Sequence, residues 1–344
     1  MPNYTGTVLS PDRAEHPLIN RNHGTHDVTT RNAKTDPQVQ AFFRPEMLQI
    51  YRSAAPVSEW AINAWCCAMG DQNPVYQDRE AARRHGHKDV FAPPVMMHSF
   101  TLPGVVGESE DSLLTALRRR LAPFDIDSVL AANYEHEYIT PIRVGDRLTR
   151  EVRYESMSDE KVTAVGIGHF VVMVERILNQ DGEIIGNQKT RVLFFRPGKF
   201  EKPQSSAAPH AAETPKLEAL NRVDLPPLVI PLTTTLVVSG ALASNDFEKI
   251  HHDRDVAQAQ GLKDVVMNVL TSCGLILRYV TDWAGPATVV KRIASQLKIP
   301  NYPGDVMTLT GSAEKPFERG TETVLRVRGT NSLGTHIEST ITIT

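Results

Sequence analysis

The sequence predicts an α+β protein of two similar halves, each with a long helix packed against an antiparallel sheet. The first observation is an internal repeat, in which identical residues recur 175 positions apart. The second is a series of strand-like alternating segments in each half. The third is a proline-rich stretch between the halves. The repeated residues are Asp78, Arg79, Ala82, Gly86, Lys88, Asp89 and Val90 in the first half and Asp253, Arg254, Ala257, Gly261, Lys263, Asp264 and Val265 in the second.

Length and composition indicate a globular protein with two cores of ordinary size. The chain has 344 residues, of which 41% are hydrophobic and 22% are charged. A net charge of −3 gives no reason to expect a nucleic-acid partner. There is no stretch of 18 apolar residues and no signal-peptide core, so we expect no membrane partner and a cytoplasmic location. Three cysteines argue against a disulfide framework.

The first half is expected at residues 46–196, after a polar, turn-rich N-terminal arm at 1–45. Its apolar segment at 95–102 is stopped by Pro103 and Gly104, so the helix expected there is short. Apolar periodicity predicts other helices at 47–51, 60–69 and 80–84. Alternation predicts strands at 133–139, 147–156, 169–178 and 184–195.

The second half is expected at residues 229–344, after a proline-rich linker at 197–228. It repeats the order of the first half, and two such halves can join their sheets edge to edge. Its helices are predicted at 246–250, 256–260 and, as one long apolar helix ended by Gly285, at 268–283. Its strands are predicted at 293–299, 306–313, 323–330 and 336–344.

The two copies of the repeat differ in their capacity for acid–base chemistry. Asp246 is followed five residues later by His251, whereas Asp71 is followed at the same spacing by Tyr76. Five residues of straight helix turn through about 140°, so Asp246 and His251 converge only where the chain bends. A carboxylate and an imidazole that converge on one water form a general acid–base device. The alternative is a capping aspartate beside a surface histidine.

The polar residues beside Asp246 and His251 are not expected to take part in catalysis or to bind a metal ion. His252 follows His251 and is expected to point away from the pair. Consecutive side chains diverge too far for easy shared coordination, so we expect no metal site.

Two segments resemble the MaoC-like hotdog hydratases. Residues 70–78 read Gly-Asp-Gln-Asn-Pro-Val-Tyr-Gln-Asp, and the family signature is Asp-x-Asn-Pro-x-His-x-Asp. Residues 246–274 resemble the hydratase motif of the same family, with Lys249 and Ile250 where Asn-Pro is usual. Residues 285–305 further resemble the MaoC-like subunits that hydrate steroid enoyl-CoA thioesters in bacterial side-chain degradation.

The resemblance implies a double hotdog fold and (R)-specific hydration of a trans-2-enoyl-CoA. It implies that Asp246 and His251 activate water, and that the Val269 N–H stabilises the thioester oxygen. It places Asn268 and Gly285 in contact with the substrate. In the first copy Asp71, Tyr76 and Pro94 are the degenerate equivalents, since tyrosine replaces histidine and proline has no N–H.

The resemblance also implies a substrate class and partners. The first half is expected to be non-catalytic and to accommodate the acyl group, which we expect to be bulky, with a steroid side chain as one form. No cofactor is expected, because the CoA thioester is the substrate. Association is expected as a homodimer or with another hotdog subunit.

Three other functions stay open from the sequence. One is a hydratase or dehydratase of a small branched acyl-CoA of the mesaconyl type. Another is a non-catalytic acyl-CoA-binding subunit of a hydratase complex, which the departures at Lys249 and Val269 would fit. The third is a hotdog thioesterase.

Overall fold

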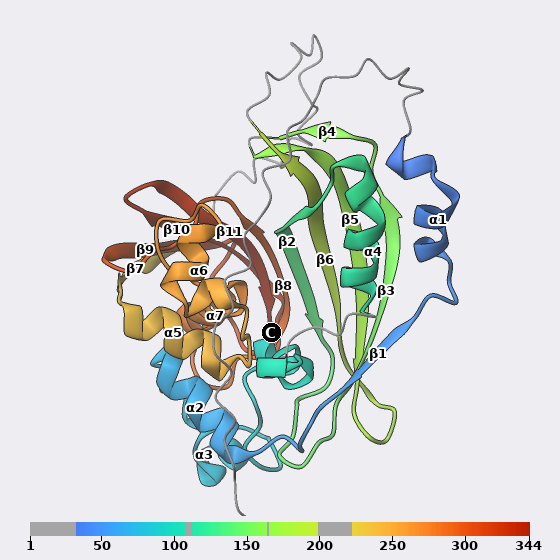
Figure 1. Ribbon diagram of the computed structural model, residues 1–344. Helices are drawn as coiled ribbons and strands as arrows, with labels where there is room; N and C mark the ends of the chain where they lie inside the picture. Colours follow the sequence, from blue (N-terminus) through green and yellow to red (C-terminus); the bar gives the residue numbers. More distant parts are fainter. Residues whose placement is uncertain (1–31, 107–111, 164, 199–221) are drawn as a thin grey trace, which may run out of the picture. The chain divides into compact units, whose positions relative to one another are not determined.

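The eleven strands of the described residues form a single sheet whose middle is the junction between the two halves. A computed structural model describes residues 32–106, 112–163, 165–198 and 222–344 (Figure 1). Along the sheet the strand order is β1-β3-β5-β6-β2-β8-β11-β10-β9-β7, with β4 paired to β5. The two halves meet where β2 (Ser128–Tyr138) runs antiparallel to β8 (Val290–Leu297). Residues 32–344 form one compact unit.

Eight of the strands fall at or near the positions that alternation predicts, whereas β1, β4 and β7 were not predicted. Every pair along the sheet is antiparallel, and buried residues alternate with more exposed ones along most strands. The first half adds to β2 the strands β1 (Gln49–Arg52), β3 (Thr149–Met157), β4 (Lys161–Val162), β5 (Gly166–Leu178) and β6 (Ile184–Pro197). The second half adds to β8 the strands β7 (Val223–Leu232), β9 (Asp305–Ala313), β10 (Thr323–Asn331) and β11 (Gly334–Ile343).

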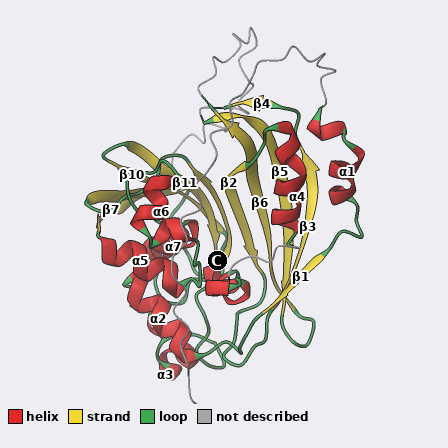
Figure 2. Ribbon diagram, in the orientation of Figure 1, coloured by secondary structure: helices red, strands yellow, loops and turns green. Residues whose placement is uncertain are grey.

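In the second half one long helix fills the concave face of the sheet. This helix, α7 (Val269–Ala284), has buried residues on all sides, as expected of a core helix. It is accompanied by α5 (Thr234–Ala243), the short turn η8 (Lys249–His251) and α6 (Arg254–Ala259). Figure 2 shows these helices together on one side of the strands.

The first half differs, because none of its described residues form a long central helix. Where such a helix would lie, the chain makes the short turns η4 (Pro94–Met97), η5 (Ser99–Thr101) and η6 (Gly104–Val106). The double hotdog is therefore confirmed, but the expectation of a long helix in both halves is wrong for the first. Prolines at positions 93, 94 and 103 lack the N–H that a continuous helix needs.

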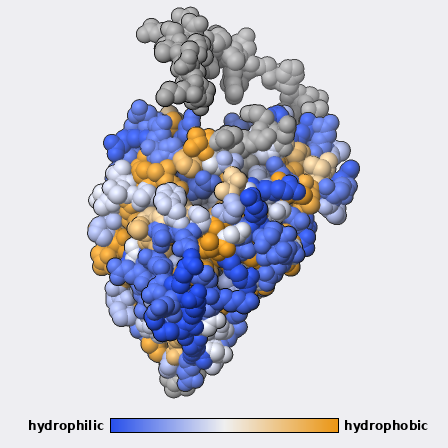
Figure 3. Space-filling model, turned by 90° about the horizontal axis from the view of Figure 1, so that it is seen from below, coloured by the Kyte–Doolittle hydropathy of each residue, from blue (hydrophilic) through white to orange (hydrophobic). Residues whose placement is uncertain are grey.

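Shorter helices cover the rest of the first half. They are α2 (Glu59–Met69), η3 (Pro74–Tyr76), α3 (Arg79–Arg84), α4 (Leu113–Leu121) and η7 (Ala122–Phe124). Helix α4 lies across β3, β5 and β6 (Figure 1) and buries Leu113, Leu117 and Leu121. The end of the molecule that carries α3 is largely hydrophilic (Figure 3), in keeping with the exposed charges of α3.

Three expectations about the ends and connections need correction. Residues 47–51 are not helical, because β1 pairs along the edge of the sheet with β3. Part of the expected arm forms η1 (Ala33–Thr35), α1 (Pro37–Gln40) and η2 (Ala41–Phe43), and Val39 is buried against α4. Part of the expected linker is strand β7, which tolerates Pro226 and Pro227 because it is an edge strand with a register shift there. Residues 1–31 and 199–221 of the arm and linker lie outside the described residues.

Apolar side chains form two separate cores. The larger core surrounds α7 and includes Ile276 and Val280, together with Ile177 and Ile185 of the first half. The smaller core lies under α4 and includes Val171, Val192 and Phe194. The concave face of the first half is therefore apolar at both ends, and the two apolar regions do not merge.

Candidate active site

Asp246 and His251 converge because the chain bends immediately before the aspartate. Helix α5 ends at Ala243, and Asn245 adopts the left-handed conformation with φ 57°. The Asp246 N–H donates to the Ala241 carbonyl, which closes the end of the helix. The short turn η8 then carries His251 back toward Asp246. The short helix expected at 246–250 therefore starts only at Lys249, and the bend that the spacing required is present.

The two side chains face each other at a distance slightly beyond a hydrogen bond. His251 Nε2 lies 3.6 Å from Asp246 Oδ2. The other ring nitrogen, Nδ1, lies 2.6 Å from the Val266 carbonyl oxygen, which can only accept a hydrogen bond. The proton of the neutral ring is therefore on Nδ1, and Nε2 is a free acceptor directed at the aspartate.

Asp246 is held from two sides. Its Oδ1 accepts from the Glu248 N–H at 3.3 Å, and its Oδ2 accepts from the Asn268 amide at 2.9 Å. The side chains of Asp246 and His251 remain 22% and 12% exposed, so both are reachable. Nε2 and Oδ2 thus form a pair of neighbouring acceptors at a partly open position.

Asn268 has a different role from the expected substrate contact. It is buried and caps α7, accepting from the Thr271 N–H through Oδ1 at 2.9 Å. Its amide nitrogen donates to Ser244 Oγ at 2.7 Å as well as to Asp246. Both donors are therefore used inside the protein, and Asn268 positions the aspartate. Sequence reasoning missed Ser244, because only the fold brings it beside this cap.

Val269 is the first residue of α7, directly after this cap. An N–H in the first turn of a helix has no partner within the helix, and the helix dipole favours negative charge beside it. Among the described residues, we find no hydrogen-bond acceptor for the Val269 N–H. This group is therefore free to bind an oxygen that gains charge.

Gly285 does not join this site, contrary to expectation. It follows the last residue of α7 and has φ 95°, a conformation that favours glycine. Its N–H donates to the Thr281 carbonyl at 2.8 Å. Since α7 has 16 residues, Gly285 lies about 24 Å from Val269 along the helix. Its role is to end the helix.

The residues of the first half that correspond to the candidate active site are buried or lack the required group. Asp71 and Tyr76 are 6% and 5% exposed, and burial raises the pKa of both groups. The Tyr76 ring packs edge-on against Phe91 at 5.2 Å between centroids. Pro94 starts the turn η4 at the place where an N–H donor would be needed. The first copy thus lacks both the imidazole and the N–H.

We predict that Asp71→Asn keeps most of kcat. The Asp71 carboxylate accepts from the Asn73 N–H, which an asparagine oxygen can also do. Because burial raises the pKa of folded Asp71, its charge destabilises the native state above the unfolded pKa of about 4. The variant should melt at the same or a higher temperature at pH 7, and this gain should shrink as the pH falls toward 4. Loss of turnover in a folded variant would place a second active site in the first copy.

His252 turns away from the pair, with Nε2 at 3.2 Å from the Phe247 carbonyl oxygen. The part of the chain that the structure describes contains no group of three or more His, Cys, Asp or Glu side chains arranged to hold a metal ion. All three cysteines are free, and Cys67 is exposed. No helix in the described ranges is both long and apolar enough to cross a membrane.

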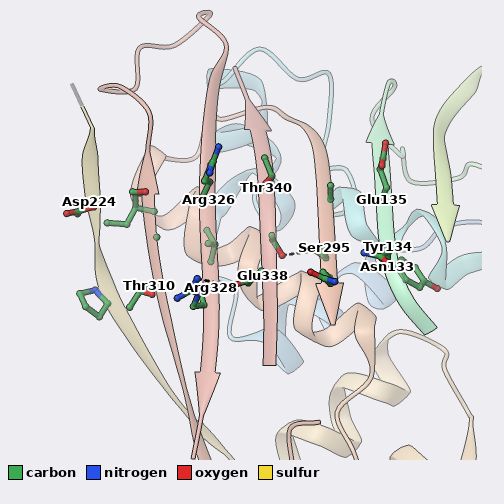
Figure 4. Close-up of a pocket in the computed structure, with 18 of the residues that line it drawn as sticks. Asn133, Tyr134, Glu135, Asp224, Ser295, Thr310, Arg326, Arg328, Glu338 and Thr340 are labelled. Carbon is green, nitrogen blue, oxygen red and sulfur yellow. Dashed lines mark hydrogen bonds and ion pairs between the residues drawn. The ribbon is translucent and has the colours of Figure 1, made fainter. Parts of the chain in front are cut away.

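A groove lies on the opposite face of the sheet. It has a volume of about 1030 Å³ and runs over β7, β9, β10, β11, β8 and β2 (Figure 4). Arg326, Arg328, Glu338 and Thr340 occupy the outward positions of β10 and β11, while Val327 between them is in the core. The groove contains neither Asp246 nor His251 and is not the candidate active site.

Comparison with known proteins supports the assignment of the family. Residues 49–188 match the FAS1-like dehydratase domain region. A 3-oxo-4,17-pregnadiene-20-carboxyl-CoA hydratase beta subunit of Mycobacterium tuberculosis is 46% identical over 117 residues, which are 34% of this chain and 89% of that protein. A probable enoyl-CoA hydratase alpha subunit of Thermomonospora curvata is 35% identical over 173 residues. Those residues are 49% of this chain and 54% of the alpha subunit, so the chain spans about half of that relative.

The fold is also similar to that of a solved MaoC-like dehydratase. The structure of a MaoC-like dehydratase aligns over 86% of this chain and 97% of its own, with a TM-score of 0.62 and 19% identity. At that identity the likeness concerns the fold, which it extends across both halves. With the sequence match to the beta subunit, it shows that this chain belongs to the MaoC-like family of hotdog hydratases and dehydratases.

Proposed function

We propose that the chain hydrates a trans-2-enoyl-CoA to a 3-hydroxyacyl-CoA. The observation that carries this proposal is the pair of acceptors, His251 Nε2 and Asp246 Oδ2, at 3.6 Å. Two acceptors at this distance cannot hydrogen-bond to each other without a proton between them. A water molecule has two donors and can satisfy both, and its oxygen lone pairs then face away from the pair.

In the proposed reaction this water adds across the double bond. Its oxygen bonds to C3 while one of its protons passes to the pair, and the π electrons move toward C2 and the thioester. The Val269 N–H stabilises the charge that develops on the thioester oxygen. A proton from the pair then bonds to C2, so that one water is added in total. The addition involves no net oxidation or reduction, and the proposal includes no cofactor.

We further propose a bulky acyl group that extends into the first half. The long helix that fills the core of the second half has no counterpart among the described residues of the first half. Both relatives described above are named as hydratases of CoA thioesters, and one name specifies a pregnadiene carboxyl group. A steroid side-chain enoyl-CoA fits this combination.

The relatives are alpha and beta subunits, and this chain resembles one of each. We propose that it unites in one polypeptide a region similar to an alpha subunit and a region similar to a beta subunit. The site residues Asp246, His251 and Val269 all come from the second half, so activity needs no residue from a partner. Association as a homodimer or with another hotdog subunit, and a cytoplasmic location, are parts of the same proposal.

Substrate profiling tests the proposed function. We predict that kcat/KM rises steeply from crotonyl-CoA through long-chain enoyl-CoA to a steroid side-chain enoyl-CoA. Binding energy from the remote tail can be used at the reacting centre, so kcat should rise as well. Loss of the enoyl absorbance with formation of the 3-hydroxyacyl product is the measurement.

The same assay separates the other candidates. A preference for crotonyl-CoA or mesaconyl-CoA would favour the small-acid hydratase. Release of free CoA, detected with a thiol reagent, would indicate a thioesterase. Tight binding of every thioester without turnover would indicate a non-catalytic subunit.

A further inference from the structure

A band of buried polar side chains crosses the concave face of the first half. Strand β2 contributes Tyr134 and His136, which pair across the sheet with Thr190 and Gln188 of β6. Gln188 in turn pairs with Glu175 of β5. We call the following residues the polar band: the half-buried Tyr134 and the buried His98, His136, Arg150, Glu175, Gln188 and Thr190.

The polar band separates the two apolar cores. Along the concave side of β5, Val171 belongs to the smaller core and Ile177 to the larger, and Glu175 lies between them. Along β6, Val192 belongs to the smaller core and Ile185 to the larger, with Gln188 and Thr190 between. A single small domain usually has one contiguous core, so this interruption requires an explanation.

Fixed charges in the band cancel. Arg150 Nη1 lies 2.9 Å from Glu175 Oε2, and both side chains are buried. The Gln188 amide donates to Glu175 Oε1 at 2.9 Å and to Thr190 Oγ1 at 3.0 Å. Burial lowers the pKa of His136 to about 3 and that of His98 well below its ordinary value. Both rings are neutral at pH 7, and the band carries no net charge.

The band nevertheless has unused hydrogen-bonding capacity. Within the described ranges His136 Nε2 and Gln188 Oε1 are buried without a hydrogen-bond partner, and His98 Nδ1 makes no hydrogen bond but lies 3.5 Å from Glu175 Oε2. His136, Gln188 and His98 are 1%, 2% and 6% exposed. A buried polar atom without a partner is destabilising, so several together indicate that a ligand or water completes them.

Tyr134 lies against both histidines of the band. Its ring contacts His98 and His136, with centroids 6.3 Å and 5.3 Å away. Burial, then the charge of Glu175 and also that of Asp246, raise the pKa of its hydroxyl. The segment that carries Asp246 contacts the turns of the first half, because the side-chain amide of Asn245 donates to the Leu102 carbonyl at 2.8 Å.

We propose that the polar band hydrogen-bonds a neutral oxygen, a ring ketone or hydroxyl, on the acyl group of the substrate. This inference rests on the proposed function and specifies its substrate class as an oxygenated, bulky acyl-CoA. A carboxylate or phosphate would face Glu175, and an ammonium group would face Arg150. A neutral oxygen meets neither repulsion and can use the free atoms of His136 and Gln188.

A matched pair of substrates tests the proposal. The probes are a steroid side-chain enoyl-CoA with a ring ketone and the same thioester without that ketone. We expect the ratio of their kcat/KM values to be at least about 10 in the unaltered protein, because the deoxygenated analogue leaves buried polar atoms unpaired. Gln188→Met and Thr190→Val should each move this ratio toward 1. Lys189→Met, on the exposed face of the same strand, should keep it.

Each outcome is decisive. Turnover of both thioesters at equal kcat/KM would overturn the proposal, as would an unchanged ratio in both folded variants. A band with only a structural role predicts a lower melting temperature with the ratio retained. If neither thioester is hydrated, the proposed function fails instead, and equilibrium dialysis with the two CoA-free steroid acids then tests the band alone. Equal affinity for those acids would overturn the inference.

Discussion

Asp246→Asn and His251→Ala are each expected to lower kcat by about 100-fold or more. The first change removes the negative acceptor that would orient water in the proposed reaction, and the second removes the ring nitrogen that faces Asp246. Asparagine can still accept from the Asn268 amide, so the loop should keep its conformation. The measurement is kcat for hydration of a long-chain enoyl-CoA, with circular dichroism as a check of folding.

His252→Ala is the matched control for the histidine. His252 is the next residue along the chain, but its Nε2 contacts a carbonyl oxygen rather than Asp246. It should keep kcat within about 3-fold of the unaltered protein, since a residue outside the reaction contributes no acid–base step. Near-normal turnover in Asp246→Asn or His251→Ala would remove that residue from the mechanism.

Val269→Pro is expected to lower kcat by about 100- to 1000-fold while leaving the fold intact. Proline lacks the N–H that would stabilise the thioester oxygen. It is well suited to the first position of a helix, where that N–H has no helical partner. Asn268 before it has φ −75° and ψ 162°, which a following proline accepts. Catalysis and stability should therefore separate in this variant.

Thr234→Pro is the matched control for this substitution. Thr234 is exposed and is the first residue of α5, after a cap with φ −90° and ψ 155°. Both variants should melt near the temperature of the unaltered protein, and only Val269→Pro should lose kcat. Equal kcat in the two variants would show that the Val269 N–H does not stabilise the reacting oxygen.

Local patterns in the sequence account for much of the fold. Alternation of apolar residues depends only on neighbouring positions, so most strands of both halves were predictable, but not β1, β4 and β7. Helices α4 and α5 escaped prediction. Helix α5 is apolar on most sides, since it packs between α2 and α7, and thus lacks a clear helical period. Residues 47–51 form a strand because β3 offers a partner, which local periodicity does not record.

The sequence by itself determined the two-half architecture and singled out Asp246 and His251, because a repeat with one altered position is visible without coordinates. Only the tertiary structure decided that Asn268 orients the aspartate and that Gly285 lies at the far end of α7. It also assembled the polar band, whose members come from four strands and one turn. Those contacts join residues far apart in the chain, and pairing between distant strands leaves no periodic signal at any one of them.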